Sequence, residues 1–390
     1  MRKICVVTAT RAEYGPLKPL ISDLFFDDEV ELQLIVTGTH LSPEFGMTIE
    51  QIQADNIPIR KTIEILLSSD TPVGIGKSMG LAQISFIEAF DELKPDIVVV
   101  LGDRYELIPI VSSANILSIP VAHISGGEKT EGAIDEIIRH AVTKMSSIHF
   151  TAMDEYRNRV IQMGEQPKNV FTVGEIGLDN ISRLDLLKKD EFEKSINKKL
   201  NKHNYLVTYH PETTLSLDEN INALNEILFS LDQLNQSLFI FTKSNADCGG
   251  RQINELLDEY VNKNSKKAVI FDSLGQLRYL SALQYVDAVI GNSSSGICEV
   301  PSFKLATINI GERQCGRVRS KSVIDVKAKR EDISEALFEI KSEKFSTDIL
   351  NDLINPYGNG NTSIKIMEIL KTIDLKNIQI KIFYDLNNYK

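Results

Sequence analysis

Short apolar runs rich in β-branched and aromatic residues recur along the whole chain, and longer stretches with helical periodicity separate them. In the first half, the strand candidates are 3–9, 30–38, 97–102, 119–125, 148–152 and 169–174. In the second half, they are 205–210, 238–243, 268–273, 288–293 and 306–311. Strands that are apolar on both faces and joined by helices belong to parallel sheets with a helical layer on each side. The pattern therefore predicts an α/β protein with doubly wound, Rossmann-like sheets.

The number of strand candidates exceeds what one open sheet comfortably holds, so we expect two sheets in two domains. The length of 390 residues also fits two domains of roughly 150 residues or more. A charged, weakly apolar stretch at 185–204 offers a boundary. We expect an N-terminal Rossmann-like domain over 1–175 and a C-terminal one over 176–365. A helical pattern covers 362–372, and the C-terminal segment 366–390 is expected to pack back on the first domain.

Composition and charge exclude several classes of function. Hydrophobic residues make up 42% of the chain and charged residues 25%, as in ordinary globular proteins. The net charge of −11 argues against non-specific binding to nucleic acids or membranes. No apolar run approaches the ~20 residues of a membrane span, and the N-terminal run is too short for a signal peptide. We expect a cytoplasmic protein with reduced cysteines and, because His and Cys lack ligand spacing, no metal.

Polar motifs directly follow many of the expected strands. Because ligands bind beyond the carboxyl ends of strands in open parallel sheets, these motifs predict a ligand site. If the two domains face a central cleft with both of these edges, the motifs surround one ligand. The motifs are RAEYG (11–15), GDRYE (102–106), HISGGE (123–128), HPETT (210–214), KSNAD (243–247), GNSSSG (291–296) and GERQCGR (311–317).

The motifs of the second half favour a nucleoside diphosphate. Ser293 and Ser294 precede a helical segment, and the N–H groups at a helix start attract phosphate. Arg313 can pair with phosphate oxygens through two parallel hydrogen bonds, and Glu299 can accept bonds from ribose hydroxyls. His210 lies at a strand end, where it can assist a phosphate leaving group. The alternatives are a plain helix cap for the serines and a structural role for the histidine.

The motifs of the first half supply cations and acids. Arg11 follows the first strand, and Asp103 and Arg104 follow another. The stretch 123–141 adds Glu128 and Asp135 after paired glycines, which let a backbone approach a ligand closely. Acids at two strand ends that face a phosphate pocket indicate acid–base chemistry on a nucleotide-linked group.

These residues also have structural interpretations. Arg11 can be a surface arginine, and Asp103 and Arg104 can form a salt-bridged turn. Asp135 and Arg139 are four residues apart, a spacing that allows an ion pair within one helix. No G-x-G-x-x-G follows the first strand, which argues against NAD or FAD, and we expect no cofactor.

Taken together, the motifs resemble those of the hydrolysing UDP-N-acetylglucosamine 2-epimerases of bacterial sialic acid synthesis. The resemblance runs in order from about residue 3 to residue 320, through TRAEYG, GDRYE, GGEKTEGAIDEIIRHAVTKMSSIHF, HPETT and GNSSSGICEV with GERQCGR. It implies a fold similar to the GT-B glycosyltransferases, with two Rossmann-like domains. It also implies the release of UDP and N-acetylmannosamine from a UDP-sugar, and a homodimer or homotetramer.

The resemblance assigns roles to individual positions. Asp103 matches a catalytic acid of the family, and Asp135 matches another. The positions that match nucleotide-binding residues are Arg11, Arg104, His210, Asn245, Ser293, Ser294, Glu299 and Arg313. One position departs from the pattern, because many relatives have a glutamate directly before the paired glycines and this chain has Ser125. Either Glu128 takes over that role or Asp135 serves alone.

Within this family, the implied chemistry begins with loss of UDP, which makes the hydrogen at C2 of the sugar acidic. A carboxylate removes that hydrogen to give a 2-acetamidoglucal, and water then adds at C1 while a proton returns to C2 from the opposite face. The same motifs fit an enzyme that hydrolyses UDP-N,N'-diacetylbacillosamine for legionaminic acid synthesis. A GT-B glycosyltransferase and a nucleotide-sugar binding protein are further alternatives, and the intact acids disfavour the latter.

Overall fold

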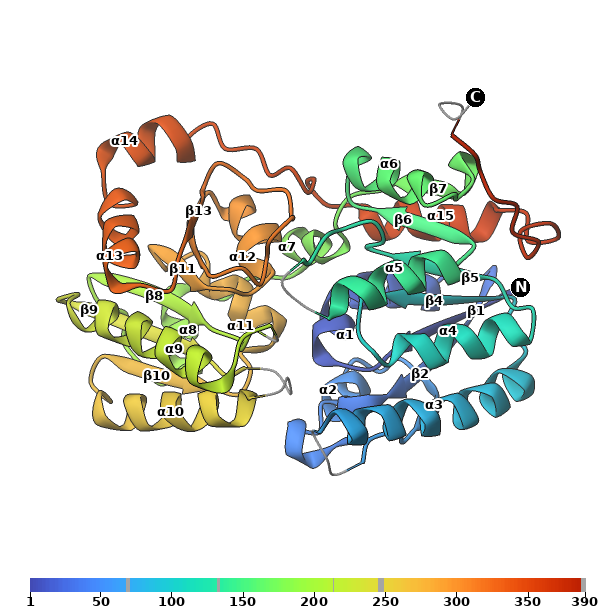
Figure 1. Cartoon of the computed structure of the whole chain (residues 1–390), viewed down its shortest axis with the longest axis horizontal. Helices are drawn as coiled ribbons and strands as arrows, with labels where there is room; N and C mark the ends of the chain where they lie inside the picture. Colours follow the sequence, from blue (N-terminus) through green and yellow to red (C-terminus); the bar gives the residue numbers. More distant parts are fainter. Residues whose placement is uncertain (68–70, 132–133, 213, 245–248, 387–390) are drawn as a thin grey trace. The chain divides into compact units, whose positions relative to one another are not determined.

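The structure is a computed structural model, and it describes residues 1–67, 71–131, 134–212, 214–244 and 249–386. The chain divides into two compact units (Figure 1). The first unit contains Met1–Glu128 and Ile134–Ser182, together with the C-terminal residues from Tyr357 onward. The second contains Lys129–Ala133 and Arg183–Pro356. Each is an α/β unit with its own parallel sheet, as the sequence predicts.

In the described residues of the first unit, seven parallel strands pair in the order β3-β2-β1-β4-β5-β6-β7. The order reverses between β1 and β4, so the sheet is doubly wound. The strands are β1 (Arg2–Thr8), β2 (Val30–Thr37), β3 (Ile59–Ile63), β4 (Ile97–Leu101), β5 (Val121–Ile124), β6 (Ile148–Thr151) and β7 (Val170–Thr172). The helices are α1 (Arg11–Phe25), α2 (Ile49–Ala54), α3 (Pro72–Leu93), α4 (Leu107–Ile116), α5 (Asp135–Met145), α6 (Asp154–Gln162) and α15 (Thr362–Thr372).

The described part of the second unit repeats this winding with six parallel strands, in the order β10-β9-β8-β11-β12-β13. The strands are β8 (His203–Thr208), β9 (Ser237–Thr242), β10 (Ala268–Phe271), β11 (Ala288–Gly291), β12 (Ala306–Ile310) and β13 (Val323–Val326). The helices are α8 (Lys189–Ser195), α9 (Leu217–Asp232), α10 (Gly250–Lys263), α11 (Gly275–Ala282), α12 (Ser295–Cys298), α13 (Arg330–Glu339) and α14 (Glu343–Phe345), and α7 (Asp179–Arg183) joins the two units along the chain.

The central strands of the first sheet, such as β1 and β4, are buried on both faces, which explains why they are mostly apolar. Along β1, Ile4 and Val6 pack into one core with residues of α1 and α15, whereas Cys5 and Val7 pack into another with α3 and α4. Side chains alternate between the two faces of a strand, so each face carries its own core. Among the helices of the described residues, none is both long enough and apolar enough to cross a membrane.

Two strands of the structure are absent from the expected set. They are β3 and β13, and each lies at one edge of its sheet. In β3, exposed side chains alternate with partly or fully buried ones, and no side chain of β13 is fully buried. Neither strand therefore shows the apolar run that marks a central strand. An edge strand needs less apolar surface because it has only one neighbour.

The observed division of the chain also differs from the expected boundaries at 175 and 365. The helix start at Thr362 and Ser363 donates two backbone hydrogen bonds to the Asp179 carboxylate, at 2.8 and 2.7 Å. Residues up to Ser182 and from Tyr357 onward therefore lie with the first unit. Figure 1 shows α15 among the elements of that unit, where it packs against α1. The roles expected for the two domains stay predictions.

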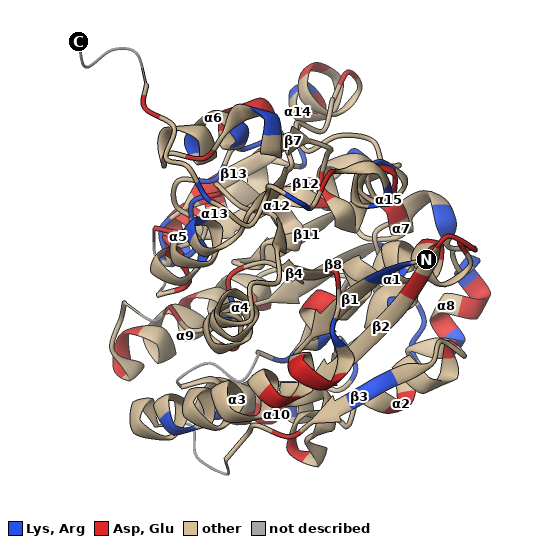
Figure 2. Cartoon of the chain, turned by 90° about the vertical axis from the view of Figure 1, so that its right-hand side faces the viewer, with Lys and Arg blue, Asp and Glu red and all other residues tan. Residues whose placement is uncertain are grey.

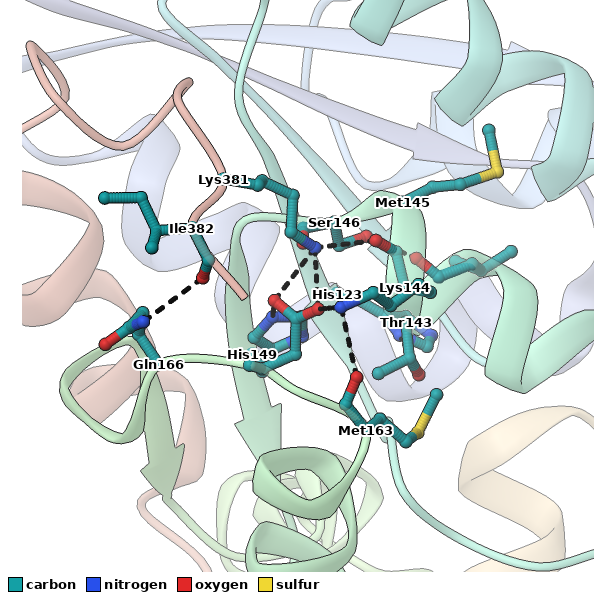
Figure 3. Close-up of polar contacts among 12 residues, drawn as sticks. His123, Thr143, Lys144, Met145, Ser146, His149, Met163, Gln166, Lys381 and Ile382 are labelled. Atoms are coloured by element: carbon teal, nitrogen blue, oxygen red, sulfur yellow. Dashed lines mark hydrogen bonds and ion pairs between the residues drawn. The ribbon is translucent and has the colours of Figure 1, made fainter. Parts of the chain in front are cut away.

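Residues that follow α15 also dock on the first unit, through an ionic cluster around the buried Glu165 carboxylate (Figure 3). Lys381 donates hydrogen bonds to the carbonyls of Lys144 and Ser146, where α5 ends. Its ammonium also lies 2.8 Å from the Glu165 carboxylate. Glu165 in turn contacts Lys144 at 2.8 Å and His149 at 3.1 Å. A cation at the C-terminal end of α5 complements the negative end of the helix dipole.

Neighbouring residues complete the docking of this segment. Tyr384 donates its backbone N–H to the Gly164 carbonyl at 2.9 Å, and the Gln166 side chain donates to the Ile382 carbonyl at 3.1 Å. A Cβ atom at Gly164 would lie 2.3 Å from the Phe383 ring, and Gly164 also has φ of +89°. Only glycine fits this position without a shift of the ring and backbone strain.

The charges of the cluster set its response to pH. Burial raises the pKa of Glu165, but the hydrogen bonds from His149, Lys144 and Lys381 outweigh it and lower the pKa to about 2. A carboxylate with a depressed pKa stabilises the fold above its unfolded pKa, and this contribution is lost as pH falls through the folded pKa.

We predict that Lys381→Met lowers the free energy of unfolding by about 1.5–3 kcal/mol at pH 7, the range for a hydrogen bond to a charged group. The difference from the wild type should shrink as pH falls from about 4.5 towards 2, because Glu165 then takes up a proton. Urea titrations at several pH values measure it. Lys376→Met is the matched control, because it removes a lysine of the same segment that is not part of the Glu165 cluster. Equal stability of the two variants would show that the cluster does not hold the segment.

Candidate active site

A buried arginine organises the acids of the first unit. Arg139 lies on α5 with its side chain 2% exposed. Its guanidinium forms an ion pair with Asp103 and donates a hydrogen bond to the Ser125 carbonyl at 2.7 Å. The Glu128 carboxylate lies 3.6 Å away, and that side chain is also 2% exposed. One guanidinium therefore gathers the loops that follow β4 and β5.

Local sequence explains how these groups reach one another. Asp103 follows β4 after Gly102, which has φ of +89° and so turns the chain sharply. Arg139 lies on the same face of α5 as Val142 and Thr143, which are three and four residues further on and are fully buried. The apolar face of α5 thus carries the arginine inwards to the strand ends.

The paired glycines are required by packing inside the first unit. Gly127 has φ of +78°, and a Cβ atom there would lie 2.4 Å from the Tyr156 carbonyl oxygen. At Gly126, a Cβ atom would lie 3.1 Å from both His123 Nδ1 and Thr143 Oγ1. Ser125 precedes them with φ of +64°, so its carbonyl points to Arg139 from a left-handed turn. The expected reason was close approach to a ligand; the structure shows close approach to the protein itself.

A second buried group surrounds the start of α1. Arg11 is the first residue of α1 and is half-buried. Glu13, two residues further on in the first turn, accepts a hydrogen bond from the Ala9 N–H at 2.7 Å. Burial, followed by the charge of Glu106, raises the pKa of Glu13 to about 8. The Nε atom of Arg104 lies 3.5 Å from the buried Glu106 carboxylate. Two acids and a cation therefore share a poorly solvated region at the ends of β1 and β4.

Asp135 is placed at the start of α5. It is half-buried in the first turn, where a carboxylate is favourable beside the helix N-terminus. Glu136, the next residue, forms a hydrogen bond with His140 at 2.9 Å. Figure 2 shows acidic and basic residues interspersed along α8.

In the second unit, Asn292 occupies a comparable central position. Its side chain accepts a hydrogen bond from the His210 N–H and donates one to the His210 carbonyl, both at 2.8 Å. Its own carbonyl accepts bonds from Arg313 at 3.3 Å and from Gln314 at 3.0 Å. Three motifs of the sequence, HPETT, GNSSSG and GERQCGR, are thereby joined. The ring of His210 also lies 3.3 Å from Ser244.

Glu212 fixes the loop that carries Arg313. Its carboxylate oxygens accept bonds from the Glu312 N–H at 3.2 Å, and a Cβ atom at Gly311 would overlap them at 1.9 Å. Burial raises the pKa of Glu212, and the hydrogen bond from the Glu312 backbone opposes this rise. The glycine and the buried acid together set the path of the loop.

The remaining predicted residues lie at or near α12, a single helical turn. Ser294 precedes α12 and Ser293 Oγ lies 3.0 Å from Ser295 Oγ. Glu299 follows it and accepts a hydrogen bond from Gln276 at 3.2 Å. Burial raises the pKa of Glu299 to about 7 against this hydrogen bond. Asn245, the other predicted nucleotide-binding residue, lies outside the described residues.

The sequence therefore located the strand-end motifs but missed the residues that connect them. Arg139 and Asn292 lie within the predicted motifs, but their role in joining the motifs was not predicted. Glu212 was not predicted as a site residue. The available signal was an arginine on the apolar face of a helix and polar residues inside strand-end motifs. Within the described part of the chain, no group of three or more His, Cys, Asp or Glu side chains is arranged to hold a metal ion.

A comparison with protein families decides which family carries this arrangement. The family model described as UDP-N-acetylglucosamine 2-epimerase matches residues 24–371, most of the chain. The chain belongs to the UDP-N-acetylglucosamine 2-epimerase family. The family relationship agrees with the resemblance that its motifs show.

Relatives in this epimerase family cover almost the whole chain. A Campylobacter jejuni protein named GDP/UDP-N,N'-diacetylbacillosamine 2-epimerase (hydrolyzing) is 45% identical over 99% of both chains. The polysialic acid biosynthesis protein P7 of Escherichia coli is 40% identical over 99% of this chain and 98% of its own. The crystal structure of the Neisseria meningitidis UDP-GlcNAc 2-epimerase, bound to UDP-GlcNAc, matches with a TM-score of 0.80. It is 20% identical and covers 94% of this chain and 99% of its own, which supports the fold.

The buried ion pair leads to a prediction about stability. Arg139→Met should lower the free energy of unfolding by about 3–5 kcal/mol, because it leaves Asp103 and Glu128 without their buried partner. Arg60→Met is the control, since Arg60 is exposed on β3 of the same unit. Urea unfolding followed by circular dichroism measures both. A loss below that of the control would show that Arg139 does not hold these acids.

Proposed function

We propose that this epimerase-family chain is a hydrolysing 2-epimerase of a UDP-linked 2-acetamido sugar. Its first candidate substrate is UDP-N-acetylglucosamine, which it converts to UDP and N-acetylmannosamine for sialic acid synthesis. We also propose that it acts in the cytoplasm as a homodimer or homotetramer and needs no cofactor. The observation that carries the proposal is the Asp103–Arg139–Glu128 group at two neighbouring strand ends of an epimerase-family fold.

In this proposal, residues of the second unit hold the nucleotide. Arg313 and the backbone around Ser293 and Ser294 bind the diphosphate, because cations and N–H groups stabilise the charge that develops on the leaving group. Glu299 accepts hydrogen bonds from the ribose hydroxyls, and His210 assists departure of the diphosphate. The joint attachment of His210 and Arg313 to Asn292 supports a shared role for them.

The acids of the first unit act on the sugar. As the C1–O bond breaks, the bonding pair leaves with UDP and a carboxylate takes the proton from C2, so that a C1–C2 double bond forms. Water then adds its oxygen to C1 and gives one proton to a carboxylate, while an acid delivers a proton to the other face of C2. We assign these proton transfers to Asp103, Glu128 and Asp135. Arg11 and Arg104 contribute positive charge near the substrate. Since Ser125 replaces the glutamate of many relatives, Glu128 is our candidate for that function.

A second candidate substrate is N,N'-diacetylbacillosamine linked to UDP or GDP. The observation that favours it is the 45% identity to a relative named for that substrate. The sugar differs from N-acetylglucosamine at C4 and C6, and the chemistry at C1 and C2 is the same. Both candidate substrates therefore require the same acids of the enzyme. They differ only in the residues that would recognise C4 and C6 of the sugar.

Turnover assays with several nucleotide sugars provide the first test. Purified protein should release nucleoside diphosphate and a C2-inverted free sugar from UDP-N-acetylglucosamine or from UDP- or GDP-linked diacetylbacillosamine. NMR identifies the sugar, and kcat/KM ranks the substrates. A higher kcat/KM for a diacetylbacillosamine nucleotide would select the second candidate. Release of nucleoside diphosphate only when an acceptor sugar is present would instead indicate a glycosyltransferase.

Substitution of single acids provides the second test. Asp103→Asn and Asp135→Asn should each lower kcat by roughly 10²-fold or more, the usual scale for positioned acid–base groups. Glu128→Gln should cause a comparable loss if Glu128 replaces the missing glutamate. Asp28→Asn is the control, because Asp28 is exposed on the same unit. Near-normal turnover of a variant would remove that residue from the mechanism.

A further inference from the structure

His123 is a buried residue of β5 whose ring is bonded on both sides. Its Nε2 atom lies 2.7 Å from the Gly102 carbonyl oxygen, and its Nδ1 atom lies 3.1 Å from Thr143 Oγ1. A carbonyl oxygen can only accept a hydrogen bond, so Nε2 carries the hydrogen and donates it. Nδ1 then accepts from the Thr143 hydroxyl. Figure 3 shows His123 and Thr143 beside each other, and the bonds define one tautomer.

The ring is neutral and tightly held. Burial lowers the pKa of His123 to about 3. The Gly102 hydrogen bond and the charge of Asp103 act in the opposite direction, whereas Arg139 and His149 lower the pKa further. A protonated ring would also carry a hydrogen on Nδ1, which could no longer accept from Thr143.

The two hydrogen bonds of His123 connect the turn that carries Asp103 with the helix that carries Arg139. Gly102 directly precedes Asp103, and its left-handed backbone sets the direction in which the chain leaves β4. Thr143 lies one turn beyond Arg139 on α5, and Arg139 forms the ion pair with Asp103. The path from Asp103 through the Gly102 backbone, His123, Thr143 and α5 therefore returns to Asp103. This closed series of contacts holds Asp103 both at its backbone, through Gly102, and at its carboxylate, through Arg139.

We propose that His123 is a positioning residue that orients the Asp103 carboxylate for the reaction. This inference rests on the proposed function of the same site. His123 carries no proton to or from the substrate, because both of its nitrogen atoms are occupied by protein groups and its side chain is fully buried. Its contribution is to hold the Gly102 carbonyl, and thus the turn that presents Asp103, against α5.

The test compares two substitutions at His123. His123→Leu keeps an apolar side chain of similar size but removes both bonds, and it should lower kcat roughly 10- to 100-fold, the scale of a misplaced catalytic group. The Kd for UDP should not change, since the proposed diphosphate contacts lie in the second unit. His123→Gln can still donate to the Gly102 carbonyl and should recover most of kcat. Equal kcat values for the two variants would overturn the proposed donor role.

His149→Leu is the matched control for a general loss of stability. His149 is the register partner of His123 on β6 and is equally buried, but it bonds to Glu165. We expect this variant to be less stable while its kcat per folded molecule is unchanged; thermal unfolding gives the folded fraction. An equal fall in kcat for His149→Leu and His123→Leu, or unchanged kcat in the latter, would overturn the inference.

A measurement that needs no turnover separates this inference from the proposed function. Nitrogen-15 NMR of the wild-type protein should show His123 neutral with its hydrogen on Nε2 between about pH 5 and pH 8. A hydrogen on Nδ1, or a charged ring, would overturn the inference even if the enzyme is active. Absence of turnover on every nucleotide sugar in the wild type would overturn the proposed function instead.

Discussion

The ion pair between Arg139 and Asp103 is the interaction on which the arrangement of the first unit's acids depends. A guanidinium that is withdrawn from water is costly unless its donors are satisfied, and here Asp103, Glu128 and the Ser125 carbonyl surround it. The loops after β4 and β5 must therefore converge on α5. The positive φ at Gly102 turns the chain directly before Asp103, and Gly127 lets the loop after β5 pack closely against α6.

The second unit reaches a comparable result around a neutral residue. Asn292 offers a donor and an acceptor from its side chain and a further acceptor from its backbone, so one buried residue joins His210 and Arg313. Neutral hydrogen bonds avoid the desolvation cost of a second buried charge. The charged Arg139 therefore gathers acids in the first unit, whereas the neutral Asn292 gathers Arg313 and His210 in the second.

Much of this fold can be predicted from the sequence, because central strands of a parallel sheet are apolar on both faces. The strands from β1 to β12 other than β3 were expected near their observed positions, whereas β3 and β13 were not, since edge strands bury less surface. The helix from Thr362 was also expected. Its contacts with Asp179, which keep the end of the chain with the first unit, were not predictable because they join residues far apart in the sequence.

The candidate site shows a similar limit. Strand-end motifs reveal Asp103, Glu128 and Arg313 because polar residues stand out after apolar runs. Arg139 and His123 are harder to assign, since an arginine on the apolar face of a helix and a histidine in a strand can each have many partners. Their roles depend on which side chain lies opposite, and only the folded chain determines that.

Isotope incorporation during turnover tests elimination and rehydration most directly. In deuterated water, the released sugar should carry one solvent deuterium at C2, and in ¹⁸O-labelled water it should carry the label at C1. NMR and mass spectrometry of samples taken early, before slow exchange of the free sugar, detect both. A product that keeps its original hydrogen at C2 would contradict elimination and would indicate simple hydrolysis or glycosyl transfer.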